Sequence, residues 1–223
     1  RRELSFPWEC EIRVGSVDKA LLATMQAAGC YYVDIGVESG SQRVLDECVR
    51  KGIRLEQARD TLRWTRELGL LTKVFFTSGH PGETYAEGLA TRNFIWRNRS
   101  SIRLQAYQAG IKIYPGTYVA DYAEQHGLMP PGFRWSRPYI NEDNRALFRQ
   151  PDNVPLLLQP QLTLRELRRL RLWFIAMRCS SARFLWEKAS AILRGRALAE
   201  YAGIIARGAG QALRRGARAK LRG

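Results

Sequence analysis

Residues 28–41 read AGCYYVDIGVESGS, and this stretch decides the fold class. Its centre, residues 31–37, is rich in β-branched and aromatic side chains and is bounded by glycines, a pattern typical of a β-strand. One face of this strand is apolar and the other is polar: the first holds Tyr31, Val33, Ile35 and Val37, and the second holds Tyr32, Asp34, Gly36 and Glu38. The apolar face can pack against helices, whereas the polar face suits the interior of a barrel.

Strand and helix patterns alternate on both sides of this stretch. Strands are predicted at residues 8–14, 31–37 and 73–77, with one more inside 102–113. Helices are predicted between them: one capped by Ser16 and ended by Gly29, one ended by Gly52, one over residues 55–68 and one over residues 83–97. Short connections in such an order indicate parallel strands with helices outside. The sequence therefore predicts an α/β fold, either an open sheet or part of a barrel.

The carboxyl ends of two successive predicted strands carry residues that suit a ligand. Glu38 ends the first strand, and the strand at residues 73–77 leads into Gly79-His80-Pro81-Gly82-Glu83-Thr84. Parallel α/β folds bind their ligands at this edge of the sheet. We therefore expect Glu38 and the glycine-rich turn to face one common pocket.

The pattern changes in the second half of the chain. A short helix is predicted at residues 119–126, and residues 129–160 are rich in proline, asparagine and tryptophan without a clear period. Long helices are predicted over residues 163–193, beginning with the capping box Thr163-x-x-Glu166. We therefore expect an α/β part over residues 1–125, an irregular connector over 126–160 and a basic, helical region over 161–223.

The charge is large and concentrated near the end of the sequence. The net charge is +15, and from Arg194 onward the only carboxylate side chain is Glu200 among eight basic residues. Such a block attracts an anionic membrane surface or nucleic acid, although a solvated tail is the alternative reading. The basic and aromatic residues of 168–174 fall on different helix faces, so nucleic acid is the weaker expectation.

Other sequence features narrow the class of protein. Residues 1–11 contain no apolar segment typical of a signal peptide, and no apolar run reaches the roughly 18 residues that a membrane-spanning helix needs. The four cysteines are widely spaced, which suits a reducing compartment better than a disulfide framework. A cytoplasmic location is predicted. The basic tail would also allow a peripheral position at the inner face of the membrane.

Three motifs together resemble the second half of a radical S-adenosylmethionine (SAM) enzyme core. They are Ala28 to Ser41 with Val44-Leu45 and Lys51-Gly52, then Gly79 to Thr84, and then Tyr114-Pro115-Gly116-Thr117. The combination is most similar to the radical SAM enzymes with a cobalamin-binding domain, which include methyltransferases and cyclases for lipids, tetrapyrroles and natural products. The resemblance covers roughly the first 125 residues, judged by the length of the pattern. It implies a partial (β/α) barrel.

The resemblance also implies which residues bind the cofactor. Glu38 matches the carboxylate near the ribose or amino group of SAM, and a carboxylate can accept two hydroxyl hydrogen bonds at once. Gly79 and Gly82 match a turn on the adenine side, where glycine lets the backbone approach. Ser39 and Ser41 match small polar neighbours, with helix capping as an equal alternative.

The third motif and the turn leave further roles open. Tyr114 and Pro115 match the exit of the last strand, where an aromatic ring could flank adenine, although a core tyrosine is the equal alternative. His80 could act as an acid or base, but a purely local role is favoured. Glu83 is expected to stabilise the start of its helix through the helix dipole. No catalytic or metal-binding residue is assigned.

The chemistry of this family needs groups that the sequence does not supply. A four-iron, four-sulfur cluster is held by a CxxxCxxC loop, and no such loop and no cobalamin module occur in these 223 residues. We therefore expect the carboxy-terminal portion of a longer enzyme, inactive without its missing amino-terminal half. That enzyme would abstract hydrogen from a small-molecule or lipid-like substrate and then transfer a methyl group or close a ring. The alternative is a catalytically inactive remnant whose basic tail binds anionic membrane or nucleic acid.

Overall fold

The computed structural model describes residues 6–143, 147 and 153–179. The chain divides into two compact units, Arg1–Ile175 and Ala176–Gly223. Of the second unit, only the last turn of one helix lies within the described residues. The predicted boundaries at residues 125 and 160 stay predictions, and the basic tail lies outside the described residues.

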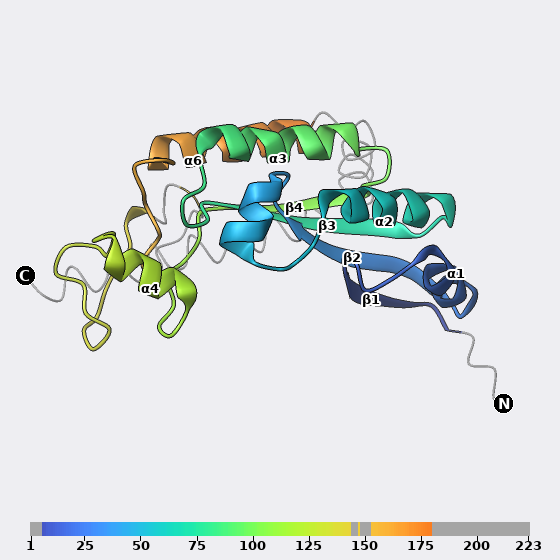
Figure 1. The fold of residues 1–223 in the computed structure, drawn as a ribbon, viewed down its shortest axis with the longest axis horizontal. Coiled ribbons are helices and arrows are strands. Elements are labelled where there is room, and N and C mark those ends of the chain that lie inside the picture. Colours follow the sequence, from blue (N-terminus) through green and yellow to red (C-terminus); the bar gives the residue numbers. More distant parts are fainter. Residues whose placement is uncertain (1–5, 144–146, 148–152, 180–223) are drawn as a thin grey trace, which may run out of the picture. The chain divides into compact units, whose positions relative to one another are not determined.

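The first unit is built on a four-stranded parallel sheet (Figure 1). The strands lie in sequence order: β1 (Trp8–Arg13), β2 (Cys30–Glu38), β3 (Leu71–Ser78) and β4 (Leu104–Ala109). The crossover helices are α1 (Lys19–Ala27), the π-helix η1 (Val44–Val49) with α2 (Leu55–Glu67), and α3 (Tyr85–Arg97). Right-handed crossovers that always step to the next strand keep these helices on one side of the sheet. The predicted α/β fold, a partial (β/α) barrel, is confirmed.

The strand β2 alternates as its sequence predicts. Val33, Ile35 and Val37 are fully buried on the helix side of the sheet. Tyr31, predicted on the same face, is instead half exposed, at the point where the pairing of β1 with β2 shifts register between Trp8 and Glu9. The polar face of β2 is thereby turned away from the helices.

Three local predictions about helices are corrected. Asp18, not Ser16, caps α1, because the Asp18 side chain accepts from the Leu21 amide while the Ser16 hydroxyl donates to the Arg13 carbonyl at 2.8 Å. The helix ended by Gly52 is a π-helix, closed by Arg50 in the left-handed conformation. The helix predicted from Glu83 begins at Tyr85, because Thr84 is its N-cap.

The chain after β4 returns across the same unit. The predicted short helix is α4 (Tyr118–Gln125). Residues 155–157 then run antiparallel to residues 111–113, where the Ile113 amide donates to the Pro155 carbonyl at 2.8 Å and the Leu157 amide donates to the Ile111 carbonyl at 2.9 Å. This pairing carries the following residues toward the carboxyl edge of the sheet.

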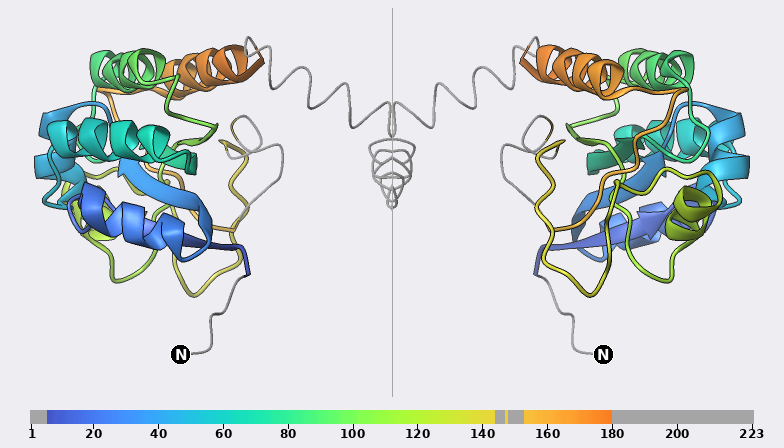
Figure 2. Two further views of the ribbon diagram at one scale, coloured as in Figure 1. Left: turned by 90° about the vertical axis from the view of Figure 1, so that its right-hand side faces the viewer. Right: turned by 90° about the vertical axis from the view of Figure 1, so that its left-hand side faces the viewer.

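The helix α6 (Leu164–Cys179) closes the described part of the chain. The predicted capping box is confirmed, since Glu166 accepts from the Thr163 amide and hydroxyl at 2.8 Å each. The first part of α6 lies beside α3 in both views (Figure 2), and a Cβ on Gly88 would overlap Leu170. Among the described residues, no helix is long and apolar enough to cross a membrane.

Candidate functional site

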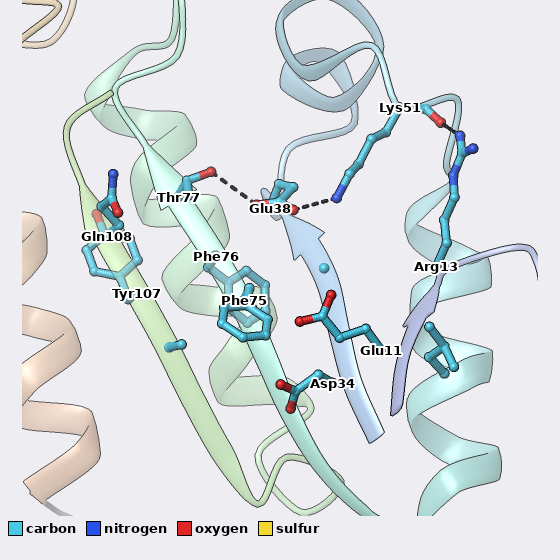
Figure 3. Close-up of a pocket in the computed structure, with 13 residues that line it drawn as sticks. Glu11, Arg13, Asp34, Glu38, Lys51, Phe75, Phe76, Thr77, Tyr107 and Gln108 are labelled. Atoms are coloured by element: carbon cyan, nitrogen blue, oxygen red, sulfur yellow. Dashed lines mark hydrogen bonds and ion pairs between the residues drawn. The ribbon is translucent and has the colours of Figure 1, made fainter. Parts of the chain in front are cut away.

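A pocket of about 760 Å³ opens on the polar face of the sheet, away from α1, α2 and α3 (Figure 3). All four strands contribute to it. Its lining consists of Glu11, Ile12, Arg13, Asp34, Gly36, Glu38, Lys51, Phe75, Phe76, Thr77, Ala106, Tyr107 and Gln108. The polar row predicted for β2 therefore lines a cavity, as a barrel interior requires.

Glu38 is directed into this pocket by an irregular strand end. The pairing of β2 with β3 shifts register between Gly36 and Glu38, so Val37 is an extra residue on β2. Glu38 itself has φ 71°, which side chains other than glycine seldom adopt. A bulge of this kind changes the direction in which a side chain points. A positive φ at a residue other than glycine costs about 1–3 kcal/mol, and residues strained in this way cluster at functional sites.

The Glu38 carboxylate is held from two sides (Figure 3). Lys51 Nζ lies 2.5 Å from Oε1, and the Thr77 hydroxyl donates to Oε2 at 3.4 Å. Each carboxylate oxygen offers two lone-pair sites. One site on each oxygen is thus left for a ligand, which matches a pair of neighbouring hydroxyl groups.

Gly36 provides the room for this arrangement. A Cβ on Gly36 would lie 2.8 Å from both Glu38 Oε1 and Lys51 Nζ. The ion pair therefore occupies the space above a residue that has no side chain. A second cation reinforces the loop, since the Arg13 guanidinium donates to the Lys51 carbonyl.

The deeper part of the pocket carries a layer of charges. Glu11 on β1 and Lys73 on β3 both stand in register with Asp34 on β2. Lys73 Nζ lies 3.2 Å from Asp34 Oδ2 and 4.4 Å from the centre of the Phe75 ring. Of these residues, Glu11, Asp34 and Phe75 line the pocket, and Lys73 contacts two of them.

The turn after β3 is fixed from behind by Glu83. This fully buried carboxylate accepts from the Gly79 amide at 2.7 Å and from the His80 amide at 3.0 Å. Burial raises its pKa to about 7, against these two hydrogen bonds. Glu83 therefore fixes the turn through these two amides, while its interaction with the helix dipole stays a prediction.

Arg43 joins the turn to the loop after β2. Its guanidinium contacts Glu87 at 2.6 and 2.7 Å and donates to the Gly82 carbonyl at 2.9 Å. Burial opposes ionisation of Glu87, but the hydrogen bonds from Arg43 and Thr84 outweigh it and lower the pKa to about 2. Glu87 is therefore a permanent anion that ties the two loops together.

His80 lies next to the Glu38 site. Its Nε2 is 2.7 Å from the Thr77 hydroxyl, which also contacts Glu38. Burial lowers the pKa of His80 to about 4, against the attraction of Glu38. His80 is therefore neutral near pH 7, and its position suits holding the Thr77 hydroxyl better than supplying a proton.

The structure brings some of the predicted site residues together and leaves others apart. Glu38 lines the pocket, whereas Gly79 and Gly82, in the turn at the end of the neighbouring strand, are not among its lining residues, so a common pocket for Glu38 and the turn stays a prediction. Tyr114 and Pro115 are exposed and do not line this pocket. Their proposed contact with adenine stays a prediction.

The two predicted serines serve the loop in this structure. Ser39 is fully buried, and its hydroxyl lies 3.3 Å from the Thr91 hydroxyl and accepts from the Ser41 amide. The Ser41 hydroxyl donates to Glu87 at 3.1 Å and accepts from the Val44 amide at 3.4 Å. These contacts correspond to the capping alternative, while contact with a cofactor stays a prediction.

The sequence pattern alone indicates no role for Lys51, Thr77 or Arg43. Lys51 stood inside a quoted motif, and Thr77 ends a predicted strand. Alternation along β3 could have placed Thr77 on the pocket face with Phe75, because residues two apart share a face. Nothing in the sequence pattern pairs Arg43 with Glu87, which lies on another crossover.

The topology and the motifs can now be compared with known proteins. Residues 4–95 match the family model of the radical SAM superfamily. This part of the chain, less than half of its length, is thus similar to the radical SAM superfamily. The matched segment contains β1, β2, β3 and the whole Glu38 site.

Relatives of this segment include methyltransferases. An uncharacterized methyltransferase, PH0819, from Pyrococcus horikoshii is 32% identical over 127 residues, which cover 56% of this chain and 27% of the relative. The cytidylyl-2-hydroxyethylphosphonate methyltransferase of Streptomyces wedmorensis is 34% identical over 82 residues, covering 36% of this chain and 15% of the relative. The chain thus spans less than a third of the length of these relatives.

Solved radical SAM structures resemble the fold more distantly. The radical SAM methyltransferase TsrM from Kitasatospora setae, with cobalamin and a [4Fe-4S] cluster bound, has 22% identity and a TM-score of 0.48, covering 72% of this chain and 29% of that one. The coproporphyrinogen III oxidase HemN of Escherichia coli has 19% identity and a TM-score of 0.38, covering 41% of this chain and 21% of that one.

Proposed function

We propose that this chain supplies the nucleoside-binding side of the SAM site in a cobalamin-dependent radical SAM methyltransferase. The similarity of residues 4–95 to the radical SAM superfamily and the two methyltransferase relatives support the reaction class. When bound, SAM would supply the radical that starts the reaction, with the electron coming from an iron–sulfur cluster. The alternative reaction is cyclisation in place of methyl transfer. The class of substrate, a small molecule or a lipid-like molecule, stays a prediction.

One observation carries the proposal: the Glu38 carboxylate is fixed at the carboxyl end of β2 with one lone-pair site free on each oxygen. Lys51 and Thr77 hold it there, and the adjacent strand ends in the Gly79–Gly82 turn. A ribose presents two neighbouring hydroxyl groups, and a carboxylate accepts both with charge-assisted hydrogen bonds. Glu38 therefore anchors the ribose in this proposal.

The turn has no N–H group left to donate to a ligand. Its three N–H groups, on Gly79, His80 and Gly82, all donate to protein side chains. The turn is therefore poorly suited to phosphate, which needs N–H donors. A neutral ring such as adenine suits it better, because His80 is uncharged near pH 7.

The described residues do not fit the iron–sulfur cluster. No group of three or more cysteine, histidine, aspartate or glutamate side chains in the described part of the chain could hold a metal ion. Of the cysteines, Cys30 and Cys48 are buried and Cys10 is half-buried. In this proposal, the residues of this chain bind and orient the nucleoside.

A binding titration tests the proposal. SAM is titrated into the 223-residue chain by isothermal calorimetry, with Glu38→Gln as the variant. Loss of the charge-assisted hydrogen bonds, worth about 1.5–3 kcal/mol, predicts an affinity roughly 10- to 100-fold weaker. Inorganic phosphate should give no heat of binding.

Glu67→Gln is the matched control, because Glu67 also forms a glutamate–lysine ion pair, with Lys19 at 2.7 Å, on the outer surface. Its affinity for SAM should equal that of the unaltered chain. Equal binding by the Glu38 and Glu67 variants would refute the assignment of Glu38, and a chain that binds no SAM would refute the proposed function.

A further inference from the structure

We propose that Gln159 is a positioning residue for the nucleoside-binding turn, holding Gly79–Gly82 in the shape that receives the ligand. This inference rests on the proposed function of that turn. Gln159 lies 77 residues beyond Gly82 in the sequence, and no motif pointed to it. Its role follows from its contacts alone.

The Gln159 amide makes both of its bonds to this turn. Its Oε1 accepts from the Gly82 amide at 2.9 Å, and its Nε2 donates to the His80 carbonyl at 2.7 Å. The residue is only 4% exposed, so water cannot replace these partners at low cost. One side chain thus binds an N–H and a C=O that lie two residues apart.

These bonds act on a backbone whose two glycines allow it many conformations. Gly79 has φ 102° and Gly82 has φ 69°, and glycine has more conformations to lose on ordering than any other residue. Glu83 fixes the first half of the turn through the Gly79 and His80 amides. Gln159 is the side chain that accepts from the amide of the second half, at Gly82.

The path of the chain explains why a distant residue reaches this place. Residues 155–157 pair with residues 111–113 immediately after β4, at the same edge of the sheet. The backbone of Gly110 lies against Gly79, where a Cβ would be 3.0 Å from Gly110 Cα. The segment that carries Gln159 is therefore brought to the rear of the turn by its own sheet-like pairing.

Two substitutions separate the two bonds of the amide. Gln159→Met keeps the length of the side chain and removes both bonds. Gln159→Glu keeps an acceptor for Gly82 but, when ionised, loses the donor and places charge against the His80 carbonyl. We expect SAM affinity to fall roughly tenfold or more for Gln159→Met, as two hydrogen bonds of ordinary strength predict, with Gln159→Glu also weakened.

Asn141→Leu is the matched control. Asn141 is also a buried amide, 2% exposed, that donates to the Val154 carbonyl at 3.0 Å and accepts from the Asp143 amide at 3.1 Å. Both of these hydrogen bonds join residues of the returning chain and neither involves the turn. Its loss should lower the melting temperature as much as the loss of Gln159, while SAM affinity stays within twofold.

The experiment measures SAM affinity and thermal melting of the full chain for the unaltered protein and these three variants. Exchange of the Gly82 amide hydrogen gives a local readout, and it should quicken in Gln159→Met but not in Asn141→Leu. If Gln159→Met does not fold, the role of Gln159 is tested by the SAM affinity of Gln159→Glu and by the exchange of its Gly82 amide hydrogen.

Two negative results remain distinguishable. If the unaltered chain binds SAM tightly and the Gln159 variants bind it with the same affinity, the role of Gln159 is overturned and the proposed function stays intact. An equal loss of affinity in Asn141→Leu would show a general effect of the fold and would also overturn it. A chain that binds no SAM in any form would refute the proposed function itself.

Discussion

Lys51 Nζ and Glu38 Oε1 lie 2.5 Å apart across the open space above Gly36. Both side chains are partly accessible, at 35% and 18%, so their head groups face the pocket rather than the core. This ion pair joins the strand end of β2 to the loop after the π-helix η1. It thereby fixes the carboxylate that we assign to the ribose.

Gly36→Ala should displace this ion pair. The new Cβ would lie 2.8 Å from the Glu38 and Lys51 head groups, which are flexible and can move aside. We therefore expect the free energy of unfolding to change by less than about 1 kcal/mol, within the usual range for tolerated substitutions. SAM affinity, measured by calorimetry, should fall at least severalfold.

Gly40→Ala is the comparison variant, and it should destabilise the fold. Its Cβ would meet the Thr91 Cα at 2.6 Å and the Ala90 carbonyl oxygen at 2.7 Å, which are backbone atoms and cannot yield easily. This variant should lose stability of at least about 1–3 kcal/mol in a urea titration. If Gly36→Ala instead destabilises the fold as much as Gly40→Ala, this would contradict the conclusion that the side chains above Gly36 can move aside.

Glu83 should make the fold less stable as the pH rises. Burial raises its pKa from 4.5 to about 7, so the folded chain binds this proton more tightly than the unfolded chain. The resulting stability is complete below pH 4.5 and is lost as the pH rises through about 7. Compared with Glu83→Gln, the unaltered chain should lose about 3 kcal/mol over this interval. Urea unfolding at a series of pH values measures the difference.

His80 should have the opposite effect over an overlapping range. Its pKa is lowered from 6.5 to about 4 by burial, so the unfolded chain binds the proton more tightly. Stability therefore falls as the pH decreases from 6.5 to 4, by about 3 kcal/mol relative to His80→Asn. Between pH 4.5 and 6.5 the two contributions oppose each other. A difference curve with the reversed sign for either variant would contradict the burial of that group.

Arg43→Lys should loosen the connection between the two loops. A lysine cannot contact Glu87 through two nitrogens and reach the Gly82 carbonyl as well. Because the Arg43 side chain is 41% exposed, the expected loss is about 1 kcal/mol in the free energy of unfolding. Arg63→Lys, in the exposed pairs with Asp60 and Glu67, serves as the control and should change it by less than half of that. Equal losses would mean that Arg43 acts only as a surface charge.

The sequence predicted the fold well where local pattern and tertiary structure agree. Alternation in residues 31–37 placed Val33, Ile35 and Val37 in the core and Asp34, Gly36 and Glu38 in the pocket. The order of strands and helices predicted parallel pairing, and neighbouring strands of the sheet are parallel in the structure. Helix ends were less predictable, because Ser16 and Asp18 are both good caps and only the path of the chain selects one.

The site was only half predictable for a physical reason. Motifs report residues that are close in sequence, so they identified Glu38 and the turn from Gly79 to Gly82. The side chains that fix these elements come from elsewhere: Lys51 from the loop after a π-helix, and Gln159 from a segment with no periodic pattern. Such contacts depend on tertiary pairing, which no local spacing encodes.

The most direct test of the account is a crystal structure of this chain with SAM bound. We predict that the two ribose hydroxyls lie within hydrogen-bond distance of the Glu38 carboxylate and that the adenine ring lies against the Gly79–Gly82 turn. A nucleoside bound elsewhere, with the Glu38 carboxylate contacting only Lys51 and Thr77, would contradict the central claim.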